Sequence, residues 1–222
     1  MTSVIESASN EKIKSAAKLA LSAKERKEKN SFLLEGLRLC RDAAECGVSI
    51  KTFFYTQNAF EKHEADIRFI SSKAENTYIV SKAVSLKLSD TQTPQGFFCV
   101  CSFLSPVDEK AVLKSGKFIA LENVQDPANL GAVARTAEAL GITALITESG
   151  CDIYNPKAQR AAMGSLLRLP VIRTPDLCAL IEECRKRGIK AYATTPSAGA
   201  KSITTADMSG SVIAVIGNEG NG

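Results

Sequence analysis

The chain has 222 residues, of which 45% are hydrophobic and 23% charged, with 28 lysines and arginines against 24 aspartates and glutamates. This composition excludes a collagen-like, low-complexity or largely disordered chain, and the length allows one large or two small domains. No apolar run approaches the roughly 20 residues that cross a bilayer, and the polar N-terminus lacks the pattern of a secretory signal. We therefore expect a cytoplasmic protein with no membrane segment, and the net charge of +4 favours a polyanionic partner.

Cysteine and histidine limit the chemistry that the chain can perform. An odd count of seven cysteines without a secretory signal predicts reduced, mostly buried thiols. The single histidine, His63, lies in a polar stretch and cannot form a histidine-rich metal site, so we expect no metal. A serine–histidine–aspartate triad would depend on His63, and an exposed surface histidine is the simpler interpretation.

Helices and strands alternate along the first half of the chain. We expect helices over residues 10–29, 37–46 and 81–90 and strands over residues 32–35, 52–55, 78–80 and 96–103. In the first helix, Ile13, Ala16 and Ala20 recur at helical spacing, and lysines occupy the opposite face. The alternation predicts a small α/β domain over residues 1–105.

A polar segment separates this half from the next. Residues 106–116 contain Pro106 and end at Gly116, which is typical of a linker. After it we expect strands over residues 118–122, 144–147, 171–173, 191–195 and 211–216, and helices over residues 130–140, 157–167 and 176–187. Near-continuous apolar strands that alternate with helices predict an α/β domain over residues 117–222, with a mostly parallel sheet covered on both faces.

The segment over residues 122–141 passes from a strand into a helix. Its expected inward stripe consists of Leu130, Val133, Ala134, Ala137, Leu140 and Gly141. Asp126, Pro127 and Asn129 are residue types that start helices, and capping is the simplest interpretation of all three. Arg135 lies off the stripe, so it is either a solvated arginine or a contact to phosphate or ribose at the carboxyl edge of the sheet.

Two further segments carry polar or small residues. Residues 154–170 place Lys157, Arg160 and Arg168 on a helix with a run of small residues over 161–165. This pattern fits a packed helix with solvated charges, or an edge that faces an anionic substrate or a second subunit. Residues 212–222 pass from a strand into a glycine-rich loop that lacks the dinucleotide and P-loop patterns, which argues against NAD and NTP enzymes.

Taken in order, these segments resemble the SpoU/TrmH branch of the SPOUT RNA methyltransferases. The residues that match the first motif of that family are Asn123, Asp126, Pro127, Asn129, Gly131, Ala132, Arg135, Thr136 and Ala137. Those that match its glycine motif are Gly217, Asn218, Glu219, Gly220 and Gly222. The resemblance covers about residues 117–222, and the first half more loosely resembles the L30e-like α/β module that binds substrate in the family.

The resemblance implies a trefoil-knotted α/β domain that binds S-adenosylmethionine, works as a homodimer and methylates a ribose 2′-hydroxyl of RNA. It assigns catalytic roles to Arg135, Asn129 and Glu219. Cofactor contacts are expected from Thr194, Gly217, Asn218 and Gly220. RNA contacts are expected from Lys12, Lys18, Lys24, Lys27, Lys29 and Arg160.

Three interpretations stay open at this point: a 2′-O-methyltransferase of RNA, a non-catalytic RNA-binding protein of the same fold, and an α/β enzyme acting on a small nucleotide. Ribosomal RNA is favoured over transfer RNA because a dedicated N-terminal module is present. In the family, the residue that matches Arg135 is implicated in deprotonation of the ribose. We favour a phosphate clamp for Arg135, because the pKa of an arginine stays above about 12.

A third motif follows the glycine loop in the family and closes over the cofactor, whereas this sequence stops at Gly222. We therefore expect further chain in the natural protein, and weak binding or no binding of S-adenosylmethionine by the 222-residue chain.

Overall fold

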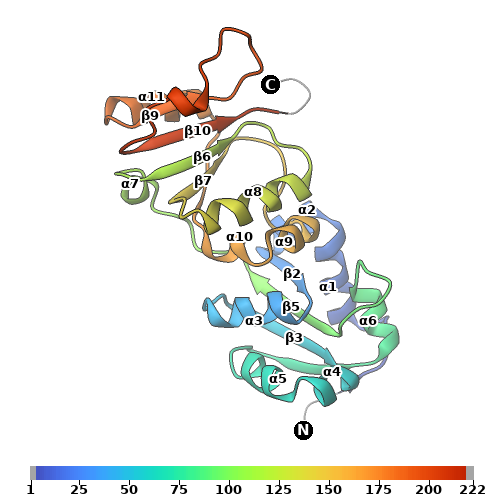
Figure 1. The fold of residues 1–222 in the computed structure, drawn as a ribbon. Helices are drawn as coiled ribbons and strands as arrows, with labels where there is room; N and C mark the ends of the chain where they lie inside the picture. The colour runs from blue at the N-terminus through green and yellow to red at the C-terminus, as the bar shows by residue number, and fades with distance from the viewer. Residues whose placement is uncertain (1–3, 219–222) are drawn as a thin grey trace.

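The structure is a computed structural model, and it describes residues 4–218. Within these residues the strands form two five-stranded sheets, one in each half of the chain (Figure 1). Sheet A consists of β1 (Val4–Ile5), β2 (Ser31–Glu35), β3 (Ile50–Thr56), β4 (Thr77–Val80) and β5 (Phe97–Ser102). Sheet B consists of β6 (Lys117–Leu121), β7 (Ala144–Thr147), β8 (Val171–Arg173), β9 (Lys190–Ala193) and β10 (Val212–Ile216).

Helices surround both sheets. Those of the first half are α1 (Glu11–Leu21), α2 (Ala23–Lys29), α3 (Leu37–Glu45), α4 (Gln57–Lys62), α5 (Glu64–Ser71) and α6 (Lys82–Leu88). Those of the second half are α7 (Glu109–Val112), α8 (Pro127–Ala139), α9 (Pro156–Ala162), α10 (Ser165–Arg168) and α11 (Leu177–Lys186), with a short 3-10 helix at Ile203–Thr205. The predicted α/β class is confirmed, whereas the domain bounds 1–105, 106–116 and 117–222 stay a prediction.

Sheet A is mixed, with strand order β1-β4-β3-β5-β2. The pairs β1–β4 and β3–β4 are parallel, and β5 runs antiparallel to both β3 and β2. One face packs against α1 and α6 through buried Ile13, Phe54 and Val84. The other face packs against α3 and α5, so both faces of the sheet are covered.

Sheet B is parallel throughout, with strand order β8-β7-β6-β10-β9, as the apolar strands of the sequence predict. One face packs against α11 through residues such as Ile146, Cys184 and Ile213. The other face packs against α8, whose Leu130 and Ala134 are buried. A β6–α8–β7 connection therefore brings the end of β6 and the start of α8 to one edge of the sheet.

The two halves share one hydrophobic core. Buried residues of sheet A, such as Phe32 and Leu34, belong to the same cluster as Leu130 of α8 and Ala158 of α9. Figure 1 shows α8, α9 and α10 between the two sheets. A continuous apolar contact of this kind favours a fixed arrangement of the halves over free domain motion.

Two predicted helices are broken. The helix predicted over residues 10–29 is divided at Ser22, whose backbone is extended and whose hydroxyl accepts a hydrogen bond from the Glu25 N–H (3.2 Å). The helix predicted over residues 157–167 is divided at Met163 and Gly164, whose φ angles are +53° and +91°. Neither an extended residue such as Ser22 nor a left-handed residue such as Met163 can continue a right-handed helix, so the chain restarts in a new direction after each.

Some local predictions need correction. Leu140, predicted to face inward, is 73% exposed because α8 ends at Ala139. The first-half elements β1, α4 and α5 were not expected, and Ile67 and Ile70 of α5 are buried in the core. All seven cysteines are free; four are buried, and burial raises the pKa of the Cys99 and Cys101 thiols. Across residues 4–218, no helix has the length and apolar character needed to cross a bilayer.

Candidate active site

The carboxyl ends of β6, β9 and β10 meet at one edge of sheet B. The Glu122 N–H donates to the Ile216 carbonyl (3.0 Å), and the Thr194 N–H donates to the Val215 carbonyl (2.9 Å). The Thr194 hydroxyl also donates to the Val215 carbonyl (3.1 Å). Open parallel sheets bind ligands at this edge. The chain therefore brings together the segments after β6, β9 and β10, although they lie far apart in the sequence.

Asn123 connects the two motifs at this edge. Its backbone carbonyl accepts a hydrogen bond from the Asn218 side-chain amide (2.8 Å). Its side-chain oxygen accepts a hydrogen bond from the Ser149 hydroxyl (3.3 Å) and another from the Gln125 amide. Asn123 has a φ of +50°, a conformation that asparagine tolerates better than most residues. The turn after β6 is thus held by its own Gln125 and by side chains from two other segments, at Ser149 and Asn218.

The start of α8 is capped as the sequence predicts. Asp126 accepts a hydrogen bond from the Ala128 N–H (3.0 Å), and Pro127 occupies the first helical position. Lys157 Nζ lies 2.8 Å from Asp126 Oδ1. This ion pair, together with the Ala128 N–H, lowers the pKa of Asp126. The capping interpretation is confirmed for these two residues, and Asn129 lies in the first turn, half-buried.

Arg135 lies on the exposed side of α8. No hydrogen bond or ion pair involves its side chain within residues 4–218. Six residues of α-helix separate Arg135 from Asn129 by about 9 Å along the axis and roughly 120° around it. The helix therefore does not bring Arg135 and Asn129 side by side, and the catalytic roles of both residues stay predictions.

Close packing between α8 and α9 fixes the position of α8. A Cβ atom on Gly131 would lie 2.4 Å from the Ala158 carbonyl oxygen and 2.6 Å from the Ala161 Cβ. The small residues of α9 therefore do allow close approach of another backbone, which is α8 of the same chain. From the sequence, the small residues over 161–165 fit contact with a second subunit. The contact between α8 and α9 within one chain already explains these small residues.

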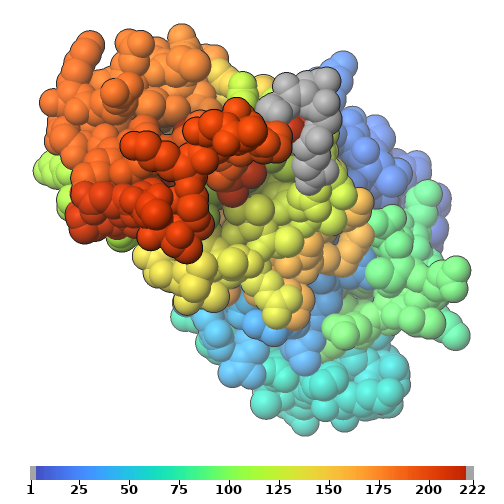
Figure 2. Space-filling model, turned by 45° about the horizontal axis from the view of Figure 1, so that its top comes forward, coloured from blue at the N-terminus to red at the C-terminus, as the bar shows by residue number. Residues whose placement is uncertain are grey.

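A cavity of about 600 Å³ opens beside the end of β9. It is lined by the backbone and side chains of Thr194 and Thr195, by Ala214 of β10, and by Ile203 and Met208 from the segment that follows β9. Figure 2 shows this orange-red segment on the same face of the molecule as the yellow α8. Gly217 and Asn218 continue from β10 at the same edge, and Glu219 and Gly220 lie outside the described residues.

Comparisons with known proteins decide the family. The family model described as "SpoU rRNA Methylase family" matches residues 116–222. The model described as "MRM3-like substrate binding domain" matches residues 10–99. Over 219 residues, 98% of this chain, the sequence is 33% identical to the 23S rRNA (guanosine(2553)-2'-O)-methyltransferase RlmP of Bacillus subtilis and covers 83% of that protein.

The chain belongs to the SpoU rRNA methylase family.

Solved structures agree with this membership. The rRNA methyltransferase from Sinorhizobium meliloti superimposes with a TM-score of 0.85 at 28% identity, over 100% of this chain and 83% of that chain. An AdoMet-bound rRNA methyltransferase structure from the same organism superimposes with a TM-score of 0.83 at 30% identity, over 99% of this chain and 83% of that chain. The predicted family, its parallel-sheet domain preceded by a smaller α/β domain, and the predicted methyltransferase class are confirmed.

The predicted RNA-binding residues of this SpoU family member lie mostly beside acidic groups. Glutamates lie within 3.7 Å of the ammonium groups of Lys18, Lys24 and Lys29. Lys12 lies over the Tyr78 ring, 5.7 Å from its centroid. Within residues 4–218, no ion pair involves Lys27. RNA binding by these lysines stays a prediction.

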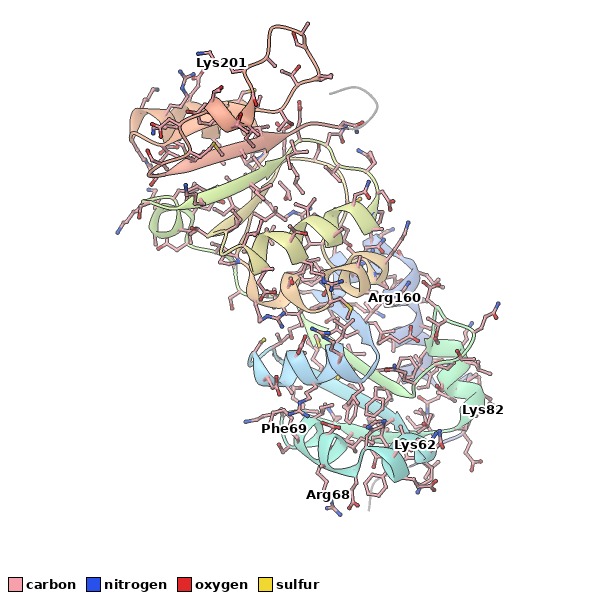
Figure 3. All side chains as sticks on the ribbon, in the orientation of Figure 1. Lys62, Arg68, Phe69, Lys82, Arg160 and Lys201 are labelled. Carbon is pink, nitrogen blue, oxygen red and sulfur yellow. The ribbon has the colours of Figure 1, made fainter. Side chains whose placement is uncertain are left out.

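Arg160 connects the two halves of the SpoU chain. Its guanidinium lies 2.7 Å from the carboxylate of Asp90 and 3.9 Å from that of Glu35, both from the first half. Figure 3 shows Arg160 in the middle of the molecule, on α9. RNA binding by Arg160 stays a prediction, and a phosphate would have to compete with these two carboxylates.

In the sequence, Asn123 belongs to the matched motif and Lys157 lies on a helix that could face an anionic substrate. Neither is predicted to make a catalytic, cofactor or RNA contact, and the structure places both at the site. Asn123 is the first residue of the matched motif and follows a buried strand, and this signal could have identified it as a turn residue. Lys157 follows the Asn155–Pro156 helix start, but its pairing with Asp126 depends on tertiary contacts. Among residues 4–218, no group of three or more histidine, cysteine, aspartate or glutamate side chains could hold a metal ion.

Proposed function

We propose that this chain transfers the methyl group of S-adenosylmethionine to a ribose 2′-hydroxyl of ribosomal RNA. The observation that carries the proposal is the hydrogen bond from Asn218 to Asn123, which joins the two family motifs at the carboxyl edge of sheet B. The likeness to RlmP, named as a 23S rRNA 2'-O-methyltransferase, supports the substrate class. The AdoMet-bound structure from Sinorhizobium meliloti supports the cofactor.

The residues at this edge fit S-adenosylmethionine. The cavity of about 600 Å³ lies within the range of small-molecule sites. Its lining combines hydroxyl and backbone groups at Thr194 and Thr195 with apolar Ile203 and Met208, which suits a nucleoside with an aliphatic chain. Asp207 is the acidic residue of the lining, and it is already paired with Lys190. Thr194, Gly217, Asn218 and Gly220 are the proposed cofactor contacts.

Bound S-adenosylmethionine supplies an already activated methyl group on a sulfonium. The ribose oxygen would form the new bond to the methyl carbon as the carbon–sulfur bond breaks with its electrons kept on sulfur, and the hydroxyl proton would pass to a solvent water molecule. The protein therefore mainly aligns donor and acceptor and stabilises the developing charge on oxygen.

Arg135 is the residue proposed for that stabilisation. Its side chain has no partner to give up among residues 4–218, and its planar guanidinium can hold a phosphate while facing the developing alkoxide. Asn129 would orient the ribose or Arg135, and Glu219 would fix Arg135 as an ion pair. An always-protonated arginine is unsuited to accept the proton itself.

A homodimer and a cytoplasmic location also belong to the proposal. The exposed side of α8 carries small side chains around Arg135, namely Ala132, Thr136 and Ala139, and ends at exposed Leu140. This surface would suit a second copy of the chain. Sedimentation of a monomer at high micromolar concentration would contradict the dimer.

The natural full-length protein, tritiated S-adenosylmethionine and an unmethylated 23S rRNA transcript test the proposed function. We expect label in the RNA, at a nucleotide whose 3′ bond resists alkaline hydrolysis. Mapping of 2′-O-methyl sites in total RNA from a strain lacking the gene would identify the target nucleotide. Label in transfer RNA alone would overturn the ribosomal substrate, and tight RNA binding without any label would favour a non-catalytic binding protein.

A further inference from the structure

A notch of about 250 Å³ lies between the two halves of the chain, where α1, the end of α6 and the start of α9 meet. We call it the interdomain notch. Its apolar lining includes Ala20, Leu21 and Leu88, and its polar lining includes Lys87, Asp90, Asn155 and Lys157. The first five of these residues belong to the substrate-binding half and the last two to the methylase half.

The interdomain notch adjoins the active-site edge. Lys157 lines the notch and also pairs with Asp126, the residue that caps α8 (2.8 Å). Asn155, another lining residue, caps α9 by accepting the Lys157 N–H (2.8 Å). An RNA strand that contacts the first half and also places a ribose at the carboxyl edge of sheet B would pass this position.

Buried contacts hold the two walls of the notch in place. Arg26 Nε donates to Asp152 Oδ2 across the two halves (2.8 Å), and the two side chains are only 3% and 15% exposed. The Arg26 guanidinium also donates to the Leu19 carbonyl, which fixes the end of α1 (2.7 Å). Arg160 of α9 holds Asp90, on the opposite side of the notch (2.7 Å). The notch is therefore formed before any ligand arrives.

The lining combines an uncovered apolar surface at Leu21 with the ammonium group of Lys87, and the carboxylate in the lining, Asp90, is already paired with Arg160. Leu21 is 81% exposed, because α1 ends there and the chain turns at Ser22 into α2. Lys87 is exposed and has no hydrogen bond or ion pair within the part of the chain that the structure describes. A flat apolar group would cover Leu21, while Lys87 would meet an anionic group at the rim.

We propose that the interdomain notch binds one nucleotide of the RNA substrate next to the target, with its base on Leu21 and its phosphate at Lys87. The inference rests on the proposed function, since it assigns part of the same RNA. Unpaired RNA bases are bound through their faces and edges, and the side-chain amide nitrogen of Asn155 supplies a hydrogen-bond donor at this position. The notch then selects the sequence or shape that flanks the methylated ribose.

The double variant Leu21→Ser/Lys87→Ala tests this assignment. We expect the KM for an unmethylated 23S rRNA transcript to rise about tenfold, because an apolar contact to one base and one phosphate contact are both lost, while kcat stays within about twofold. The slope of log affinity against log salt should fall by about 0.7, the contribution of one phosphate contact to single-stranded RNA. A residue with a merely structural role would not change that slope.

The double variant Lys82→Ala/Leu86→Ser is the matched control. Both residues are exposed and lie on α6, outside the lining of the notch, and Figure 3 shows Lys82 at the outer side of that helix. We expect its KM and salt slope to equal those of the unaltered protein. Equal effects of the two double variants, or a changed kcat with an unchanged KM in the first, would overturn the assignment.

A photocrosslink locates the nucleotide directly. Leu21→p-benzoylphenylalanine should crosslink to a nucleotide neighbouring the methylated one, whereas the same substitution at Leu86 should give no specific product. Crosslinks far from the methylated ribose, or crosslinks to protein alone, would overturn the proposal. If the unaltered protein transfers no methyl group, the proposed function fails, while the salt slope of transcript binding still tests the notch.

Discussion

The helices α1–α2 and α8 both carry basic residues that the sequence predicts to contact RNA, yet their surroundings differ. On α1 and α2, Lys18, Lys24 and Lys29 already have glutamate partners. On α8, Arg135 has no partner within residues 4–218. A paired lysine must give up its glutamate to meet a phosphate, whereas Arg135 has no partner among the described residues to give up. Basic residues of equal appearance in a sequence therefore differ in what they can contribute to binding.

The two regions also differ in how firmly they are held. The chain breaks between α1 and α2 at Ser22, and their exposed ion pairs contribute little to stability. In contrast, α8 is pressed onto α9 at Gly131, and its last turn is tied to α10 through Glu138 and Arg168. A group that must face a reacting atom benefits from such support.

The largest effect should follow from the unpaired arginine. We expect Arg135→Ala to lower kcat for methyl transfer by about 100-fold or more, because a donor aimed at developing charge is lost. Arg135→Lys should also be poor, since lysine lacks the planar fork. Tritium transfer measures kcat, and circular dichroism should show an unchanged fold. Arg185→Ala, at another exposed arginine of the same half, is the control; near-normal turnover by Arg135→Ala would end the assignment.

The close contact that holds α8 is the next target. Gly131→Ala places a methyl group against the Ala158 backbone, so α8 or α9 has to shift to make room for it. We expect it to destabilise the fold by about 1–3 kcal/mol, although alanine is the better helix former. Urea unfolding measures the change. Gly199→Ala, at an exposed loop glycine where a Cβ atom would lie 3.9 Å from the Ser197 hydroxyl oxygen, should stay within about 0.5 kcal/mol.

The lysines of α1 and α2 can be divided by their partners. We expect Lys12→Ala/Lys27→Ala, which affects the two lysines without carboxylate partners, to lower the salt slope of RNA binding by up to about 1.5. The triple variant Lys18→Ala/Lys24→Ala/Lys29→Ala should change the slope less, despite its larger charge change. Filter binding over a salt series gives both slopes. If the salt slope falls by the same amount per lysine in both variants, the glutamate partners do not weaken the RNA contacts. If neither variant changes the slope, this face of α1 and α2 does not contact RNA.

The smallest expected effect is a change in the stability of the fold at low pH, caused by Glu138 near the end of α8. The pKa of Glu138 is lowered, mainly by Arg168 and further by Ser165, with burial acting in the opposite sense. The folded state therefore binds fewer protons than the unfolded state, so Glu138 stabilises the fold above its ordinary pKa of 4.5 and this contribution is lost as the pH falls below it. Glu138→Gln should cost about 1 kcal/mol near neutral pH and flatten the loss of stability in acid.

Chemical unfolding between pH 3 and pH 7 gives this comparison. Glu28→Gln, which removes an exposed pair with Lys24, should change stability by less than about 0.5 kcal/mol at every pH. An acid dependence of Glu138→Gln identical to that of the unaltered protein would contradict the role of this carboxylate.

Periodicity alone predicted the parallel sheet and most of its strands, because buried parallel strands are apolar on both faces. The residues over 144–147 illustrate this, since the structure places β7 at the same positions. The break at Ser22 could also have been predicted: Ser22 and Glu25 have the spacing of a helix start, although the lysine-rich pattern runs on through it. The break at Met163 could not, because the left-handed turn depends on Gly164 packing against Asp42 from the first half.

The sequence predicts the local features of the site, but it does not predict the long-range ion pairs and hydrogen bonds that join them. Asp126 and Pro127 reveal a helix start by residue type alone, and their motif carries the resemblance to the family. The pairing of Arg160 with Asp90 and Glu35 joins residues far apart in the sequence, so no local pattern contains it. The same holds for the hydrogen bond between Asn218 and Asn123.

The shared core of the two halves has a consequence for the way this molecule meets its substrate. Phe32 of one sheet and Leu130 beneath the other belong to a single apolar cluster, so pulling the halves apart would expose it to water. We therefore expect the distance between the proposed RNA-binding surfaces of the two halves to stay nearly constant. An RNA substrate that contacts both surfaces would then have to bend to fit that distance.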